Sequence, residues 1–203
     1  AMAQLAKNFN WGDNSSVYDD CLIFGNVKLG LNCWVGPFTV LDGNAFPIEI
    51  GDWTSIGTGT QVYTHHTIDQ ALSGGKLKPT TAPVSIGKNC FIGHNTIIEN
   101  NVIIGNNCSI GSNVIIRKTI IHNNVSILDG CVIGKKGFGF FPNNEKNYRY
   151  PHIGMVIIDD NSEIGCGSTI DRGSLSNTFI GKNTFLDNQV HVAHNTKIGN
   201  NCI

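Results

Sequence analysis

Aliphatic residues recur at every sixth position along most of the chain. One series covers residues 17–62, a second covers 86–133, and two shorter ones cover 158–170 and 180–198. The second series slips by one residue between Ile116 and Ile121, and about half of the aliphatic positions are followed directly by glycine. A spacing of six fits neither an amphipathic helix of period 3.6 nor a strand of period two. The pattern therefore indicates a structural repeat of six residues.

A six-residue repeat predicts an all-β fold, a parallel β-helix with three flat faces. Each hexad supplies a short strand and a corner, and three hexads make one coil. The aliphatic side chain points inward, while glycine and asparagine tolerate the unusual backbone angles of the corners. The fifth place of each hexad also points inward and holds small residues such as Thr39, Cys90 and Val114. We expect one solenoid over residues 1–203, with residues 1–16 as a lead-in, of about eight coils stacked at roughly 4.8 Å.

Charge and cysteine content narrow the function classes. The formal net charge is -1, so no broad basic field favours nucleic acid or an anionic membrane. No apolar run reaches the roughly 18 residues of a membrane span. The seven cysteines form no CxxC pair, and six of them occupy fifth places of hexads, where a free cysteine packs as a small hydrophobe. The sequence thus predicts interior reduced thiols in a cytoplasmic protein rather than a disulfide framework, a zinc site or a catalytic thiol.

Two excursions interrupt the repeat, at residues 63–85 and 135–157. Both are too long for a corner and rich in glycine, proline and polar residues. A third, shorter one covers residues 171–178. Because a prism with smooth faces has nowhere to perform chemistry, we expect the functional residues in these segments.

Histidines supply the candidate chemistry. His65 and His66 stand before Asp69 in the first excursion, where a His-x-x-Asp arrangement can provide a general base; solvated loop histidines are the alternative. His191 and His194 occupy outward positions of adjacent hexads, and an outward histidine beside Asn195 is a second candidate base. The two histidine pairs lie four or five coils apart, about 20 Å at the strand spacing, so no metal site is predicted.

The second half of the chain resembles a known family. Its motifs are GKKGFGF (134–140), IGCGSTIDRGSL (164–175) and IGKNTFLDNQVHVAHNTKIG (180–199). These are similar to the UDP-3-O-acylglucosamine N-acyltransferases of lipid A biosynthesis, which are trimeric left-handed β-helices among the hexapeptide acyltransferases. The resemblance implies that His194, in the AHN motif, is the general base. It also implies a supporting role for His191. We further expect Asn188, Asn195, Phe138 and Phe140 to contact substrate, although the aromatic cluster of the two phenylalanines could instead pack over a neighbouring subunit or only cover its own face of the prism.

The first half resembles a different subfamily. The segments QVYTHHTIDQALSGGK (61–76) and APVSIGKNCFIG (82–93) are similar to the catalytic-loop region of sugar O-acetyltransferases. There the catalytic histidine corresponds to His65 or His66. The uridine-binding domain and the later coils of the N-acyltransferases have no counterpart in this sequence. We therefore expect a truncated or hybrid chain with a junction near residues 115–121, or a natural short paralogue from a surface-polysaccharide pathway.

Together these features predict an acyltransferase. It would move an acyl group from a thioester of acyl-carrier protein or coenzyme A, with no bound cofactor, to an amine or hydroxyl of a nucleotide sugar. The site would lie in a groove between subunits of a homotrimer, because a flat face gains concavity only against a second prism. Two alternatives remain open: an acetyl-CoA-dependent sugar O-acetyltransferase that uses the His65/His66 loop, and a non-catalytic β-helix scaffold.

Overall fold

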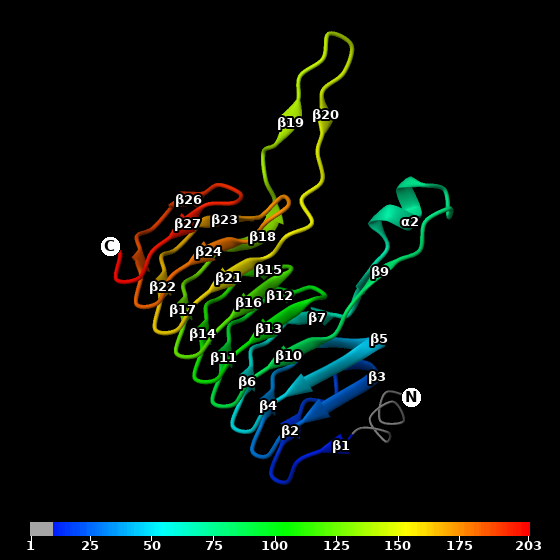
Figure 1. Cartoon of the computed structure of the whole chain (residues 1–203). Helices are drawn as coiled ribbons and strands as arrows, with labels where there is room; N and C mark the ends of the chain where they lie inside the picture. Colours follow the sequence, from blue (N-terminus) through cyan, green and yellow to red (C-terminus); the bar gives the residue numbers. More distant parts are fainter. Residues whose placement is uncertain (1–9) are drawn as a thin grey trace.

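The computed structural model describes residues 10–203, and its strands stack into the predicted left-handed parallel β-helix (Figure 1). One face of the prism is an eight-stranded sheet of two-residue strands. In order along the axis it contains β2 (Ser16–Val17), β4 (Trp34–Val35), β6 (Ser55–Ile56), β11 (Phe91–Ile92), β14 (Ser109–Ile110), β17 (Ser126–Ile127), β22 (Glu163–Ile164) and β25 (Phe185–Leu186).

The other two faces form one continuous sheet, because two long strands run around the corner between them. These are β3 (Leu22–Leu29), which also pairs with β1 (Asn10–Trp11), and β5 (Val40–Ile50). From β5, one face continues through β7 (Gln61–Tyr63), β12 (Ile97–Ile98), β15 (Ile115–Ile116), β18 (Val132–Lys136), β23 (Thr169–Arg172) and β26 (His191–Val192). The other continues through β10 (Val84–Ile86), β13 (Val102–Ile104), β16 (Thr119–Ile121), β21 (Val156–Ile158), β24 (Thr178–Ile180) and β27 (Lys197–Ile198).

The interior confirms the two inward positions of each hexad. Aliphatic residues such as Ile92, Ile110 and Ile164 are fully buried, and the fifth-place threonines Thr39 and Thr96 are buried beside them. The end coils are less covered: Val17 and Ile198 are half-buried but pack against the core. The predicted lead-in already contains β1, while its residues 1–9 lie outside the described part of the chain.

Small polar side chains at the fifth place complete the hydrogen bonding of the corners. Thr60 Oγ1 donates to the carbonyl of Gly93 at 2.8 Å, one coil further on, and Cys131 Sγ donates to the carbonyl of Gly165 at 3.1 Å. Cys33, Cys90, Cys108 and Cys131 are buried in this way, whereas Cys21 and Cys202 are half-buried in the end coils. The predicted structural role of these thiols is therefore confirmed for the four inner coils.

Replacing Thr60 with valine should destabilise the prism. Valine keeps the shape of the side chain but leaves the carbonyl of Gly93 without its 2.8 Å donor inside the core. An unsatisfied buried acceptor costs about 1–3 kcal/mol. Denaturant unfolding will measure this loss against Thr67→Val, an exposed threonine whose side chain makes no capping hydrogen bond. Equal stability of the two variants would contradict the assigned role of the hydroxyl.

Asparagine occupies most of the corners. Among the described residues, twelve of the sixteen non-glycine residues with a positive φ are asparagines, which accept the left-handed conformation more readily than other side chains. Their amides form a ladder along one edge: Asn89 donates to Asn107, Asn107 to Asn124, and Asn124 to Asn161, each at 3.1 Å. Many of the asparagines in the chain therefore serve to form and connect the corners.

The sequence slip is absorbed by a shortened coil. Lys88 N donates to Asn106 Oδ1 across 18 residues, whereas Asn106 N donates to Asn123 Oδ1 across 17. Ile116 and Ile121 are nevertheless both fully buried, and the strands on either side of the slip stay in register. The corner at Arg117 and Lys118 is therefore one residue shorter than its counterparts, while the strands keep their positions.

Candidate functional site

Both long excursions leave the same edge of the prism (Figure 1). The first follows β7 and contains β8 (His65–His66), the short helix α2 (Ile68–Leu72) and β9 (Thr80–Thr81), which pairs antiparallel with β8. The second follows β18 and forms an antiparallel hairpin of β19 (Phe140–Phe141) and β20 (Tyr148–Arg149). In the sheet, β7 and β18 are separated only by β12 and β15. The two excursions therefore stand close together as facing walls.

A cavity of about 470 Å³ lies between these walls within a single chain. The first excursion contributes His66, Ile68, Asp69 and Thr80, and the second contributes Pro151, His152 and Ile153. This volume is in the range of small-molecule sites. The expectation that concavity requires a second subunit is thus wrong, because it overlooked that both excursions emerge from one corner.

His152 is the most enclosed titratable side chain of the cavity. Its side chain is 4% exposed, and neither ring nitrogen has a hydrogen-bond partner. The ring stacks on Tyr150 at 5.5 Å between centroids and contacts the edge of His194 at 4.9 Å. The absence of a side chain at Gly137 allows this approach, since a Cβ there would lie 2.6 Å from His194 Cδ2 and 2.8 Å from His152 Nε2.

His194 is held by a polar network behind this pair. The backbone N–H of Ser174 donates to Asn195 Oδ1 at 2.8 Å, which fixes the orientation of the Asn195 amide. The amide nitrogen Nδ2 then faces His194 Nδ1 at 3.0 Å and also donates to Ser174 Oγ at 2.7 Å. Nδ1 of His194 is therefore an acceptor, so its neutral ring carries the proton on Nε2. In this state His194 presents a donor, and His152 is the imidazole with a free lone pair.

The stability of the protein should fall at acid pH through His152. Burial lowers the pKa of His152, and the nearby His194 ring lowers it further. A histidine with a lowered pKa in the folded state binds fewer protons than in the unfolded chain. Its contribution is therefore intact above the unfolded pKa of about 6.5 and is lost as the pH falls below it.

Denaturant unfolding at pH 7.5 and pH 5 will show this dependence. We expect His152→Gln to lose less stability between the two pH values than the parent protein. The control is His122→Gln, which removes an exposed ring outside the cavity lining. A parallel loss in all three proteins would contradict the assignment.

The other predicted residues have separate locations. His65 is half-buried in β8 and does not line the cavity, and its Nδ1 is buried without a partner, like that of His66. His191 is exposed, with Nδ1 at 2.7 Å from Thr169 Oγ1 and Nε2 at 3.7 Å from the buried carboxylate of Asp171. Asn188 accepts a corner hydrogen bond from the backbone of Cys166 at 2.7 Å. The structure thus brings His66 into the lining of the cavity, places His194 behind His152, and leaves His65, His191 and Asn188 apart from both.

The aromatic residues of the second excursion lie on the projecting hairpin. Phe138 is 73% exposed, contacts Phe140 edge-on at 5.2 Å and has the guanidinium of Arg149 at 5.8 Å from its ring centre. Neither phenylalanine lines the cavity. Because the hairpin projects away from the prism (Figure 1), it does not serve as a cover for its own face.

Sequence reasoning missed His152 and a group of cations. The prism edge between the walls contributes Glu99, Arg117, Lys118, Lys135, Lys136 and Arg172 to the cavity. The lysine and arginine pairs 117–118 and 135–136 stand at the slip and at the start of the second excursion. These two irregularities of the repeat could have pointed to the cations. The net charge of -1 for the whole chain gave no indication of a local positive cluster.

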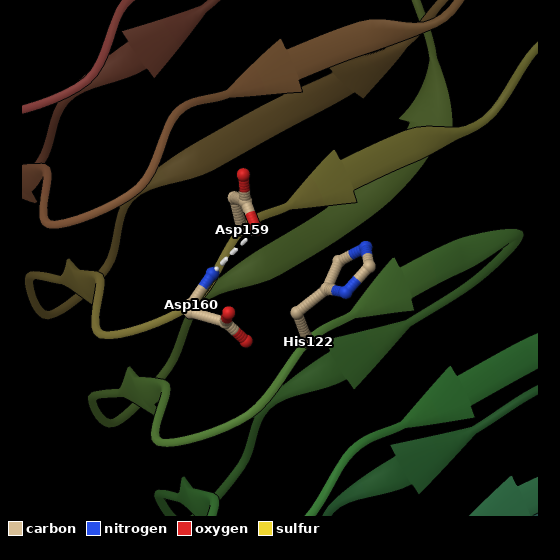
Figure 2. Close-up of side chains that lie close together, drawn as sticks. All are labelled: His122, Asp159 and Asp160. Carbon is tan, nitrogen blue, oxygen red and sulfur yellow. Dashed lines mark hydrogen bonds between the residues drawn. The ribbon is translucent and has the colours of Figure 1, made fainter.

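One group of metal-binding side chain types exists among residues 10–203. His122, Asp159 and Asp160 can bring one ligand atom each within 4.8 Å of one another (Figure 2). The two carboxylates already accept hydrogen bonds of the corner: Asp160 Oδ1 from the backbone N–H of Asn123 at 2.8 Å, and Asp159 Oδ1 from that of Asp160 at 2.8 Å. Asn106 and Asn123 make the contact of Asp160 in other coils, and Asp187 makes the contact of Asp159. These carboxylates are thus accounted for by the repeat, and none of the three lines the cavity.

Comparison with known proteins agrees with this architecture. The family model described as "Bacterial transferase hexapeptide (six repeats)" matches residues 83–118 and 177–203. The chain is a hexapeptide-repeat protein. The matched residues include the shortened corner at Arg117–Lys118 and the segment around His194. The match therefore covers regular coils as well as residues in and next to the cavity.

Two curated relatives of this hexapeptide-repeat protein are UDP-3-O-acylglucosamine N-acyltransferases. The protein from Bradyrhizobium diazoefficiens is 50% identical over 80 residues, and that from Dechloromonas aromatica is 51% identical over 77. These matches cover 39% and 38% of this chain and 22% of each relative. The chain therefore aligns with about a fifth of the length of these relatives.

A solved structure has a similar fold. A mutant of AntD, an N-acyltransferase from Bacillus cereus in complex with dTDP and coenzyme A, superposes with a TM-score of 0.50 and 27% identity. The match covers 55% of this chain and 63% of AntD. No helix of the described residues is long and apolar enough to cross a membrane.

Proposed function

We propose that this hexapeptide-repeat protein is an acyltransferase that moves an acyl group from a thioester to an amine or hydroxyl of a sugar. The observation that carries the proposal is the cavity between the two excursions, which has His66 on one wall and His152, packed against His194, on the other. Acyl transfer needs groups that take a proton from the acceptor and stabilise the developing oxyanion. Two adjacent imidazoles with different hydrogen bonding can divide these tasks.

The proton transfer is assigned to the pair of His152 and His194. The acceptor attacks the thioester carbonyl, its proton passes to an imidazole, and the thiolate leaves with that proton as a thiol. His152 has the free lone pair for the first step, and the Nε2–H of His194 is a donor for the oxyanion. The base role that the AHN motif implies for His194 itself requires Asn195 to release Nδ1.

The substrates are proposed from the relatives. Their names indicate an acylated glucosamine nucleotide as acceptor in one case, and dTDP with coenzyme A in the other. We therefore propose a nucleotide-sugar acceptor and a donor thioester of coenzyme A or acyl-carrier protein, in a lipid A or surface-polysaccharide pathway of the cytoplasm. A homotrimer remains our expectation for the assembly.

A second function is supported by the position of His66. Its ring lines the cavity, and its Nδ1 is buried without a hydrogen-bond partner. This arrangement suits a sugar O-acetyltransferase that uses acetyl-CoA and the first excursion as its catalytic loop. The two functions differ in which wall of the cavity removes the proton.

Thioester turnover distinguishes these possibilities. Release of free thiol will be followed with acyl-CoA and acyl-carrier protein donors, in the presence of amino-sugar and hydroxyl-sugar nucleotides. Loss of turnover only in His194→Ala supports the N-acyltransferase, and loss only in His66→Ala supports the O-acetyltransferase. A folded parent protein without turnover on any pair of substrates would contradict both and leave the non-catalytic scaffold.

A further inference from the structure

Positive charge is concentrated in the cavity of a chain whose total charge is nearly neutral. Five of its lining residues are cationic and two are acidic, Asp69 and Glu99, while the whole chain carries a formal charge of -1. The five cations are Arg117, Lys118, Lys135, Lys136 and Arg172. They come from the shortened corner, from the end of β18 and from β23, so three separate segments direct them to one place.

Only part of this charge is neutralised within the chain. Arg117 Nε lies 2.6 Å from Glu99 Oε1, and Lys135 forms an ion pair with the buried Asp171. Among residues 10–203, no carboxylate lies within ion-pair distance of Lys118, Lys136 or Arg172. Three cations at the cavity therefore lack a direct ion-pair partner in the described part of the chain, although Asp69 acts on Lys118 and Glu99 on Arg172 from a longer distance.

Arg172 is built into the site. Its side chain is buried, with 8% exposure, Nε donates to the carbonyl of His152 at 2.9 Å, and Nη1 donates to that of Gly134 at 3.2 Å. These bonds fix the guanidinium but do not neutralise it. A buried charge without an opposite charge is unfavourable, so its retention at a cavity indicates an external anion.

Lys118 adds backbone evidence. It has a φ of 41° at a corner where other coils place asparagine with a positive φ, at Asn101 and Asn195. A lysine in the left-handed region is strained relative to asparagine, and such strain occurs preferentially at functional sites. Burial also lowers the pKa of Lys118, and the charges of Arg172 and Lys136 lower it further. The fold thus holds this cation in place against both strain and repulsion.

We propose that the cavity binds a diphosphate group through Lys118, Lys136 and Arg172. A diphosphate carries enough negative charge for three cations and many acceptor oxygens, and arginine and lysine are the side chains that bind phosphate best. A cavity of about 470 Å³ also leaves room for the remainder of a nucleotide. The inference builds on the proposed acyl transfer, in which both the acceptor nucleotide sugar and coenzyme A contain a diphosphate.

Calorimetric titration of the full chain will test the proposal with three probes: inorganic pyrophosphate, uridine diphosphate and coenzyme A. We expect a dissociation constant below 1 mM for pyrophosphate, and we expect its affinity to fall as salt is added. Competition of pyrophosphate with uridine diphosphate assigns the site to the acceptor, and competition with coenzyme A assigns it to the donor. Binding of pyrophosphate alone still supports a diphosphate site, for a different organic part.

Two variants locate the binding. Lys118→Asn removes the cation while giving the corner its usual residue, so the protein should fold at least as well as the parent, and Lys136→Ala removes an exposed cation. Each should weaken pyrophosphate binding about tenfold, as expected for one charge-assisted contact. Lys197→Ala, an equal change of charge on β27 outside the cavity lining, should bind like the parent.

The outcomes separate this proposal from that of acyl transfer. His194→Ala should bind pyrophosphate like the parent even where turnover is lost, because His194 does not line the cavity. No binding of any probe at 1 mM, or unchanged affinity in both Lys118→Asn and Lys136→Ala, would overturn the diphosphate site. The assay of thioester turnover would still test the proposed acyl transfer in that case.

Discussion

His194→Ala is expected to lower thioester turnover by about 10²–10⁴-fold, the usual contribution of a positioned acid or base. The substitution removes the ring that packs edge-on against His152 at 4.9 Å and the acceptor that Asn195 binds at 3.0 Å. It leaves the coil intact, because the backbone N–H of Asn195 and its Oδ1 keep their own hydrogen bonds. The measurement is initial rates of thiol release with saturating donor and acceptor.

Two further variants make this result specific. His152→Gln should cause a comparable loss, and the double variant should be little worse than either single one, since residues that act as a unit are not additive. The matched control is His122→Ala, an exposed histidine that does not line the cavity, which should keep the parent rate. Full activity of His194→Ala would contradict the assignment of the pair.

Gly134→Ala should be among the most destabilising single substitutions. Gly134 has a φ of 80° and forms the bulge between Ile133 and Lys135 in the pairing of β18 with β23. An added Cβ would collide with the carbonyl oxygen of Arg117 and lie 2.8 Å from Thr119 Oγ1. Backbone strain and overpacking together should cost about 3–5 kcal/mol of unfolding free energy.

Gly130→Ala separates the two causes. Gly130 has a similar φ of 72°, but only the backbone nitrogen of Gly167, at 4.0 Å, lies near its added Cβ. This variant should therefore lose only the strain term, about 1 kcal/mol. Denaturant unfolding of both proteins gives the difference directly, and equal losses would show that the contact with Arg117 has no role.

Most of the fold could be predicted from the sequence because nearly every hexad has the same two inward positions. Aliphatic residues such as Ile92 fill the core, and small polar residues such as Thr96 bind the backbone of the next coil. The same pattern recurs in nearly every coil, which makes it easy to detect. The continuous sheet around β3 and β5 was not predicted. In β5 the spacing between Leu41 and Ile50 is longer than six, and the extra residues extend this strand through the corner, whereas β3 turns the same corner with the usual spacing from Ile23 to Leu29.

The site could be predicted only in part. His66 and His194 stood in recognisable segments, but His152 had no signal beyond its place in the second excursion. Its role depends on Gly137, Arg172 and His194, which come from different coils and meet His152 only when those coils are stacked. The single-chain cavity was missed for the same reason, since it depends on how many coils separate the two excursions.

That number of coils sets the distance between the two walls of the cavity. The walls rise from β7 and β18, three strand spacings apart in the sheet, or roughly 14 Å. Because coils are nearly interchangeable, gain or loss of one would move the walls by a fixed step of about 4.8 Å while leaving each wall unchanged. The width available to a ligand in such a protein is therefore not adjusted continuously but selected from a short series of discrete values.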